Sequence, residues 1–303
     1  MSALNIFSQP VLRRPILLTS FLGWNDASES ASGVIRYLRR RSQTKPVADI
    51  DPDDFFVFTE QRPTVRLLDS QTREITWPST NFTTMQLPKS DHDFILLLGT
   101  EPHLKWRHFA SLLVEYSQKM QVEEIVMLGS LLADTPHTRP VPLTGTASDP
   151  NRADELGFTA SRYEGPTGII GVISDLCRQK KIPHLSLWAS VPHYVSGGQN
   201  PQATRALLHR VSEIYGLKLN LDDLDARARR YEVQVSEAIE QNPEIQEYIS
   251  QLEKNSSEDN YFEIDHDNTH SNPLRSTEVL DEIDRLLRGG EDDSINTDDA
   301  KSN

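Results

Sequence analysis

Cysteine is almost absent from this chain of 303 residues, because Cys177 is the only one. A single thiol cannot close a disulfide within the chain, and it excludes the cysteine-rich zinc sites found in many small domains. The histidines are scattered without the spacing of metal ligands, so we expect no metal site. Cys177 occupies an apolar position of a predicted helix, where we expect an inert core thiol.

The chain also lacks a long apolar run and a surplus of positive charge. No stretch approaches the roughly 20 apolar residues of a membrane span. The short apolar segment Pro15 to Leu22 is followed by Trp24-Asn25-Asp26, which does not resemble a signal-peptide cleavage site. With 31 basic and 45 acidic residues, the net charge of -14 disfavours binding to nucleic-acid phosphates. We therefore expect a cytoplasmic protein with no membrane segment and no nucleic-acid partner.

Three motifs of catalysis and nucleotide binding are missing as well. No G-x-G-x-x-G sequence follows the first predicted strand, which disfavours a dinucleotide cofactor. Gly197-Gly198 is not followed by the lysine and hydroxyl residue of a phosphate loop. Ser130 follows Gly129 but lacks the glycine-serine-glycine turn of a serine nucleophile. We accordingly predict no cofactor.

The clearest pattern that is present is a strand followed by a helix between Asp93 and Met120. Phe94 to Leu98 is a continuous apolar run, short enough for a strand that is buried on both faces. A turn at Gly99 to Pro102 ends the run, and apolar side chains then recur at helical spacing at Trp106, Phe109, Leu112, Leu113, Tyr116 and Met120. A strand, a tight turn and an amphipathic helix form half of a βαβ unit.

The same alternation recurs along the chain and predicts an α/β fold with a mainly parallel sheet and helices on both faces. Further strands are predicted at Pro15–Leu22, Glu124–Leu128 and His184–Val191, and further helices at Ala27–Leu38, Ile169–Cys177 and Ala203–Tyr215. Between Asp49 and Leu87 the pieces are short and β-prone. They predict one or two strands of the main sheet with an excursion between them.

The sheet pattern ends near Leu221, which divides the chain into three predicted parts. Residues 1–219 form the α/β domain. Residues 220–254 form a helical hairpin, because apolar residues three and four apart continue on both sides of Asn242-Pro243. Residues 255–303 form a flexible acidic tail. Within this tail a short amphipathic segment comprises Val279, Leu280, Ile283, Leu286 and Leu287.

Four polar loops follow predicted strands and, in a parallel sheet, would meet at one edge. Their side chains form the candidate pocket: Trp24, Asn25, Asp26, Glu101, His137, Arg139, His193 and Tyr194. Asp26 or Glu101 with His137 or His193 could act as general acid and base. Arg139 could bind a phosphate or carboxylate, and Trp24 could cover a nucleoside-like ligand.

Each of these polar residues also has a structural interpretation. Asp26 can cap the following helix, which we rank above catalysis. Glu101 can accept backbone N–H bonds or pair with Arg107, and Arg139 can form an internal ion pair. His137 can fix its loop by a hydrogen bond, and His193 can be a buried histidine whose hydrogen bonds are satisfied.

Seven short blocks in these regions resemble the proteasome-assembly-chaperone family, in particular its actinobacterial branch. The resemblance extends from about Pro15 to Glu253, and the blocks follow one another in the expected order. They are Phe21-Leu22-Gly23-Trp24-Asn25-Asp26-Ala27, Gln61-Arg62-Pro63, Ile75-Thr76-Trp77-Pro78, Gly99-Thr100-Glu101-Pro102 with Trp106, Pro136-His137-Thr138-Arg139-Pro140, Gly165-Pro166-Thr167-Gly168 and Leu187-Trp188-Ala189-Ser190-Val191-Pro192-His193-Tyr194.

The resemblance implies a phosphorylase/hydrolase-like fold, which is a three-layer α/β/α sandwich, and a homo-oligomer. It further implies a non-enzymatic chaperone of protein assembly, with proteasome subunits among its protein partners. The alternative is a small-molecule-binding protein or enzyme that uses the pocket at the strand edge, because fold alone does not determine function. A grouping with ATP-grasp ligases has no support from a glycine-rich phosphate loop.

Overall fold

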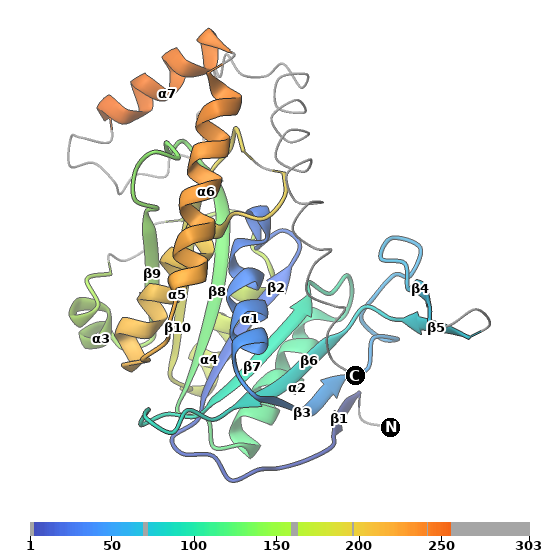
Figure 1. The fold of residues 1–303 in the computed structure, drawn as a ribbon. Coiled ribbons are helices and arrows are strands. Elements are labelled where there is room, and N and C mark those ends of the chain that lie inside the picture. Colours follow the sequence, from blue (N-terminus) through green and yellow to red (C-terminus); the bar gives the residue numbers. More distant parts are fainter. Residues whose placement is uncertain (1–2, 69–71, 159–162, 196, 241, 256–303) are drawn as a thin grey trace.

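The computed structural model describes residues 3–68, 72–158, 163–195, 197–240 and 242–255, which are built around one eight-stranded sheet (Figure 1). The strand order is β1-β3-β6-β7-β2-β8-β10-β9. Its four central strands are mutually parallel: β7 (Phe94–Thr100), β2 (Ile16–Leu22), β8 (Glu124–Ala133) and β10 (His184–Pro192). The flanking strands are antiparallel to their neighbours: β1 (Leu4–Ile6), β3 (Thr44–Ile50), β6 (Thr80–Met85) and β9 (Leu143–Ala147).

The prediction of a mainly parallel sheet is therefore right for the centre and wrong for the flanks. The connection from β6 to β7 comprises only residues 86–93. A parallel neighbour requires a crossover of a dozen or more residues, so this short link forces the two strands to run in opposite directions. The predicted α/β class, with strands and helices alternating around the central strands, is confirmed.

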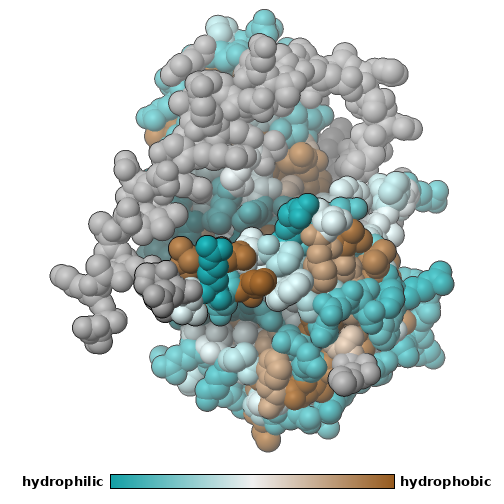
Figure 2. Space-filling view, turned by 90° about the vertical axis from the view of Figure 1, so that its right-hand side faces the viewer, coloured by the Kyte–Doolittle hydropathy of each residue, from teal (hydrophilic) through white to brown (hydrophobic). Residues whose placement is uncertain are grey.

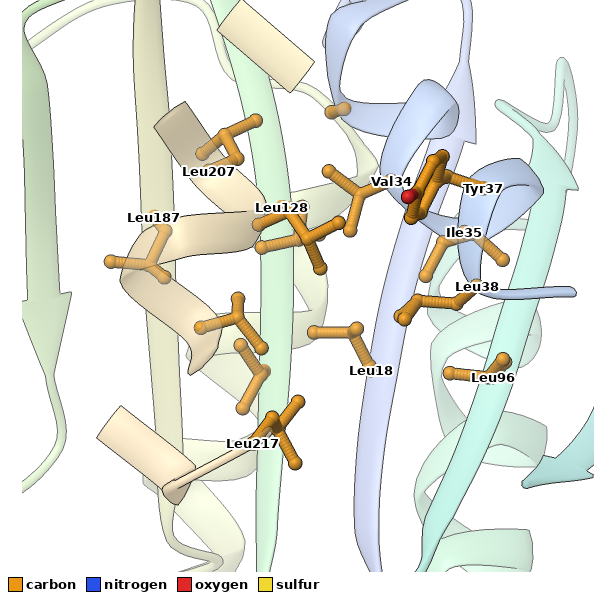
Figure 3. Close-up of a cluster of buried hydrophobic side chains, with 14 of the residues drawn as sticks. Leu18, Val34, Ile35, Tyr37, Leu38, Leu96, Leu128, Leu187, Leu207 and Leu217 are labelled. Atoms are coloured by element: carbon orange, nitrogen blue, oxygen red, sulfur yellow. The ribbon is translucent and has the colours of Figure 1, made fainter. Parts of the chain in front are cut away.

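Helices cover both faces of the sheet because successive strand residues point to opposite sides. Leu18 lies in a core cluster with α1 (Ser30–Arg41) and α5 (Pro201–Tyr215), which Figure 3 shows in close-up. Leu17 lies in a second cluster with α2 (Trp106–Lys119) and α4 (Ile169–Lys180). The central strands are thus buried on both sides, as their unbroken apolar runs predict.

The excursion predicted between Asp49 and Leu87 is a separate two-stranded hairpin of β4 (Thr64–Leu67) and β5 (Arg73–Thr76). It projects from the body beside β6 in Figure 1. The strands before and after it, β3 and β6, belong to the main sheet. Sequence analysis missed β1, β9, α3 (Pro150–Glu155) and most of β3, which lies before the predicted β-prone region. The helix predicted from Ala27 begins with the 3-10 turn η1 (Ala27–Glu29), and α1 itself starts at Ser30.

Two helices follow the sheet, α6 (Asp222–Ile239) and α7 (Pro243–Asn255). The first turn of α6 packs in the same core cluster as Leu18, where Leu221 and Leu224 are buried. Farther along, α6 joins a third cluster that contains Tyr194 and Val195 from the loop after β10. Ile245, Ile249 and Leu252 of α7 complete that cluster. Asn255, the first residue of the tail predicted over 255–303, is the last residue of α7. The rest of that tail, with its amphipathic segment, lies outside the described residues.

No helix among the described residues is both long enough and apolar enough to cross a lipid bilayer. Within the same residues, no group of three or more histidine, cysteine or acidic side chains is arranged to hold a metal ion.

Candidate functional site

At the carboxyl ends of β2 and β7, Asn25 and Glu101 are joined in one hydrogen-bond network. The Asn25 side chain is buried, and its Nδ2 donates to Glu101 Oε1 at 2.6 Å. The same oxygen accepts the backbone N–H of Ile169 at 2.8 Å. Ile169 is the first residue of α4, so the Glu101 carboxylate satisfies an unpaired amide where the helix dipole favours negative charge. Glu101 therefore has the predicted role of a backbone acceptor.

Gly168 lets the start of α4 approach Asn25 closely. A Cβ atom at Gly168 would lie between 2.4 and 2.8 Å from the Oδ1, Nδ2 and Cγ atoms of Asn25. Such contacts are too short for any side chain, so this glycine is required by packing and not by its backbone angles. The glycine of the Gly165-Pro166-Thr167-Gly168 block thus has a structural reason that involves the Trp24-Asn25-Asp26 loop.

Asp26 supplies an acceptor to the first turn of α1, in keeping with the structural interpretation of its sequence position, although Glu29 occupies the N-cap position itself. Its Oδ1 accepts the backbone N–H groups of Ala31 at 2.8 Å and Ser32 at 3.1 Å. Burial raises the pKa of Asp26 above its usual value, although these N–H bonds act in the opposite direction. Ser130 of β8 holds the same loop, because its backbone N–H donates to Asn25 O and its hydroxyl donates to Ala27 O, both at 2.9 Å.

His137 is the centre of a second group, which connects the loop after β8 to α6. The backbone N–H of His137 donates to Tyr194 Oη at 2.8 Å, and its Nδ1 lies 3.0 Å from the same oxygen. On the other side of the ring, Nε2 lies 3.0 Å from Ser236 Oγ. The backbone carbonyl of His137 accepts from Gln202 Nε2 at 3.2 Å. This buried histidine therefore links segments that are distant in the sequence.

The contacts of His137 determine which ring nitrogen carries the proton. Ser236 Oγ donates its hydrogen to Glu232 O at 2.9 Å, so it can only accept from His137. Nε2 is then the protonated nitrogen, and Nδ1 accepts the hydrogen of Tyr194 Oη. Burial lowers the pKa of His137 to about 4, while Glu253 acts weakly in the opposite direction. The ring is thus neutral near pH 7, with both nitrogens engaged.

His193 and Tyr194 belong to this second group, together with α7. His193 Nδ1 lies 3.2 Å from Asp134 Oδ1, and the same carboxylate oxygen accepts from Tyr248 Oη at 3.0 Å. Tyr194 is almost completely buried, and burial raises the pKa of its hydroxyl. Thr138 donates to the carboxylate of Glu253 on α7. The second group therefore fastens α6 and α7 to the sheet.

The eight candidate residues consequently fall into three sets. Asn25, Asp26 and Glu101 hold α1 and α4. His137, His193 and Tyr194 hold α6 and α7. The remaining two, Trp24 and Arg139, are exposed, and the Arg139 guanidinium forms no ion pair with a residue that the structure describes. Neither histidine is paired with Asp26 or Glu101.

Several partners of these residues were absent from the predicted site, in particular Ser130, Ser236, Tyr248 and Asp134. Asp134 begins the loop after β8, whereas Ser130 lies within β8, and the end of the predicted strand was the only available signal for them. Ser236 and Tyr248 occupy helical positions that carry no sequence signal of a contact across the fold. A shallow hollow lies elsewhere, between α1, α5 and α6. Its lining includes Arg36, Arg40 and Arg227 and none of the eight candidate residues.

The fold and the strand edge define an α/β protein with a mixed sheet, in which most polar side chains of the edge bind other parts of the same chain. Comparison with known proteins adds the family. The chain belongs to the PAC2 family, whose model matches residues 20–239.

Solved structures agree with this assignment. A PAC2 family protein from Streptomyces avermitilis is 40% identical, with a TM-score of 0.72 over 77% of this chain and 99% of that chain. The same four values hold for a proteasome-assembly chaperone homologue from Mycobacterium tuberculosis. PbaB from Pyrococcus furiosus, an archaeal proteasome activator, shares the fold with 15% identity and a TM-score of 0.64, over 77% of this chain and 97% of that chain. The comparison with curated proteins gives no match.

Proposed function

We propose that this protein is a non-enzymatic interaction protein that assists the assembly of a protein complex, with proteasome subunits as its partners. Family membership supports the proposal, as does the 40% identity to a protein described as a proteasome-assembly chaperone homologue. We further propose that it works in the cytoplasm as a homo-oligomer. We also propose that the chain divides into three parts, at residues 219/220 and 254/255. We propose further that its α/β domain is a phosphorylase/hydrolase-like three-layer sandwich.

The observation that carries the proposal is the contrast between polar and aromatic side chains at the strand edge. Six polar or hydroxyl-bearing candidates bind groups of their own chain, which leaves them little freedom to act on a substrate: Asn25, Asp26, Glu101, His137, His193 and Tyr194. Trp24, in the middle of the same edge, is 63% exposed. Exposed tryptophans are frequent energetic centres of protein interfaces.

Reconstitution with separately purified core-proteasome subunits of the same organism tests the proposal. Native mass spectrometry should show complexes between the full chain and these subunits, and core particles should form faster in its presence. Trp24→Ala should weaken the complex about tenfold if Trp24 is an interface anchor. Val11→Ala is the matched control, because Val11 is more exposed than Trp24 and is followed by β2. If the unmodified chain binds no subunit at micromolar concentration, the proposal is wrong.

The alternative is a small-molecule site at the same edge, favoured by the exposed guanidinium of Arg139 near the buried His137. This alternative predicts a stoichiometric small mass on the protein isolated from its own cells. Arg139→Ala should remove that mass, whereas Arg178→Ala, at an exposed position of α4 that pairs with Asp175, should leave it in place. A ligand-free oligomer that carries other protein chains would favour the assembly role.

A further inference from the structure

The β4–β5 hairpin carries an apolar face that no described residue covers. All residues of both strands are exposed. The register places Val65 opposite Ile75 and Leu67 opposite Arg73, and paired residues point to the same side. Val65, Leu67 and Ile75 therefore share one face and are each more than half exposed. Figure 2 looks onto the side from which the hairpin projects and shows apolar patches between hydrophilic ones.

The opposite face of the hairpin is polar and internally paired. Arg66 and Glu74 lie opposite each other and form an ion pair at 2.7 Å. After β5, Trp77 packs against Phe58 with 4.8 Å between ring centroids, which ties this end of the hairpin to the body. A two-stranded sheet is marginally stable in water unless something packs on its apolar face. The hairpin therefore has one polar, solvated face and one apolar face on which another segment can pack.

The charge on this face indicates what kind of segment could cover it. Arg73 lies on the apolar face, is exposed and forms no ion pair with a residue that the structure describes. Arg73 thus gives the apolar face a positive charge, and the face fits an apolar stripe that is bordered by carboxylates.

The chain itself contains such a segment after Asn255. Residues 278–288 read Glu-Val-Leu-Asp-Glu-Ile-Asp-Arg-Leu-Leu-Arg. Val279, Leu280, Ile283, Leu286 and Leu287 recur at helical spacing, and the four carboxylates of Glu278, Asp281, Glu282 and Asp284 outnumber the two guanidinium groups of Arg285 and Arg288. This stripe has too few apolar residues to fold alone, so it needs an apolar surface to bind.

We propose that residues 278–288 bind in cis to the apolar face of the β4–β5 hairpin formed by Val65, Leu67 and Ile75, with Arg73 facing their carboxylates. The contact does not depend on proteasome subunits, so it goes beyond the proposed function.

The linker is long enough for this contact within one chain. Residues 256–277 span at most about 75 Å when fully extended. A folded body of roughly 250 residues has a radius of gyration of about 18 Å, so the linker can cross it. A tethered segment of this length also has an effective concentration far above that of a second molecule in dilute solution.

A photo-crosslinker placed at Leu67 of the full chain tests the proposal. Mass spectrometry should identify cross-linked peptides that contain residues 278–288, and the intact mass should be that of one chain. The matched control carries the crosslinker at Thr76, which is also exposed but lies on the polar face opposite Thr64. This control should give no cross-link to the tail segment.

Two substitutions in the full chain separate docking from chance contact. Ile283→Asp places a charge in the apolar stripe and should lower the cross-link yield from Leu67 about tenfold. Arg73→Glu should lower it by up to about fivefold, with a weaker effect at high salt. Since both positions lie at the surface or in the tail, neither change should prevent folding. Cross-links from Leu67 to a second chain, to the body alone or to no peptide would overturn the proposal.

Discussion

The hydroxyl of Tyr194 accepts the backbone N–H of His137 at 2.8 Å and lies 3.0 Å from Nδ1 of the same residue. One phenol oxygen therefore satisfies two groups of a histidine that is separated from it by 57 positions. Together with Ser236, this pair connects the loop after β8 to α6. The first two predictions concern this connection.

Tyr194→Phe should destabilise the protein by about 1–3 kcal/mol, because it leaves a buried N–H and a buried ring nitrogen of His137 without a partner. The phenyl ring keeps the packing of the third core cluster, so the loss reports the hydroxyl alone. Urea unfolding at pH 7 measures it. Ser111→Ala, which removes an exposed helical hydroxyl bonded to Arg107 O, should change the stability by less than about 0.5 kcal/mol. Equal effects of the two changes would contradict the assigned network.

His137 should make the stability depend on pH in the acidic range. Its pKa is about 4 in the folded protein against 6.5 for the free side chain, so between these values the unfolded chain binds more protons. The free energy of unfolding should therefore fall as the pH drops from 6.5 to 4, by up to about 3 kcal/mol.

His137→Gln should flatten this pH dependence, whereas His108→Gln at an exposed position of α2 should leave it unchanged. Urea titrations at several pH values between 4 and 7 provide the measurement. Asp26 acts with the opposite sign, because its raised pKa makes the folded state bind more protons at acidic pH. Asp26→Asn should consequently steepen the decline. A slope that survives in His137→Gln would assign the pH dependence to another group.

Glu101→Ala should loosen the start of α4, because it removes the acceptor of Ile169 N–H and of Asn25 Nδ2. The expected cost is about 2 kcal/mol, with faster hydrogen exchange in the first turn of α4. Glu101→Gln is the matched variant: it keeps an acceptor oxygen and should lose less. If exchange at Ile169 is unchanged in Glu101→Ala, the carboxylate does not cap this helix.

Cys177 should resist thiol reagents in the folded protein. It is completely buried in the second core cluster, and burial raises the pKa of its thiol to about 12. At pH 8 a disulfide reagent such as dithionitrobenzoate should modify it only as fast as the protein opens, and at once in denaturant. Rapid modification of the native chain would place Cys177 at an accessible site.

Local sequence rules predicted the parts of this structure that depend on neighbouring residues. Asp26 and the stop at Gly216, which has a left-handed backbone with φ of 63°, follow from helix capping. The central strands follow from continuous apolar runs such as Phe94 to Leu98. In contrast, β9 is short, lies at the edge and alternates threonine with small residues, so it has no apolar period to detect.

The candidate site shows the same limit. The polar loops follow the parallel strands β2, β7, β8 and β10, and the structural interpretations of Asp26 and Glu101 agree with the observed hydrogen bonds. The partner of His137 on α6 could not be predicted, because Ser236 is 99 positions away and looks like any polar residue of an amphipathic helix. Which side chain meets a buried histidine depends on tertiary packing, to which local patterns are insensitive.

The attachment of α6 through His137 and Ser236 has a consequence for the order of folding. A contact across 99 residues closes a long loop, whose entropy must be lost before the contact contributes any stability. Its other anchors, Tyr194 and Val195, follow β10, the last strand among the described residues. The C-terminal half of α6 can therefore pack against the body only after β10 has joined the sheet. In a refolding experiment, protection of the amides in this half should appear later than protection in β2 and β7.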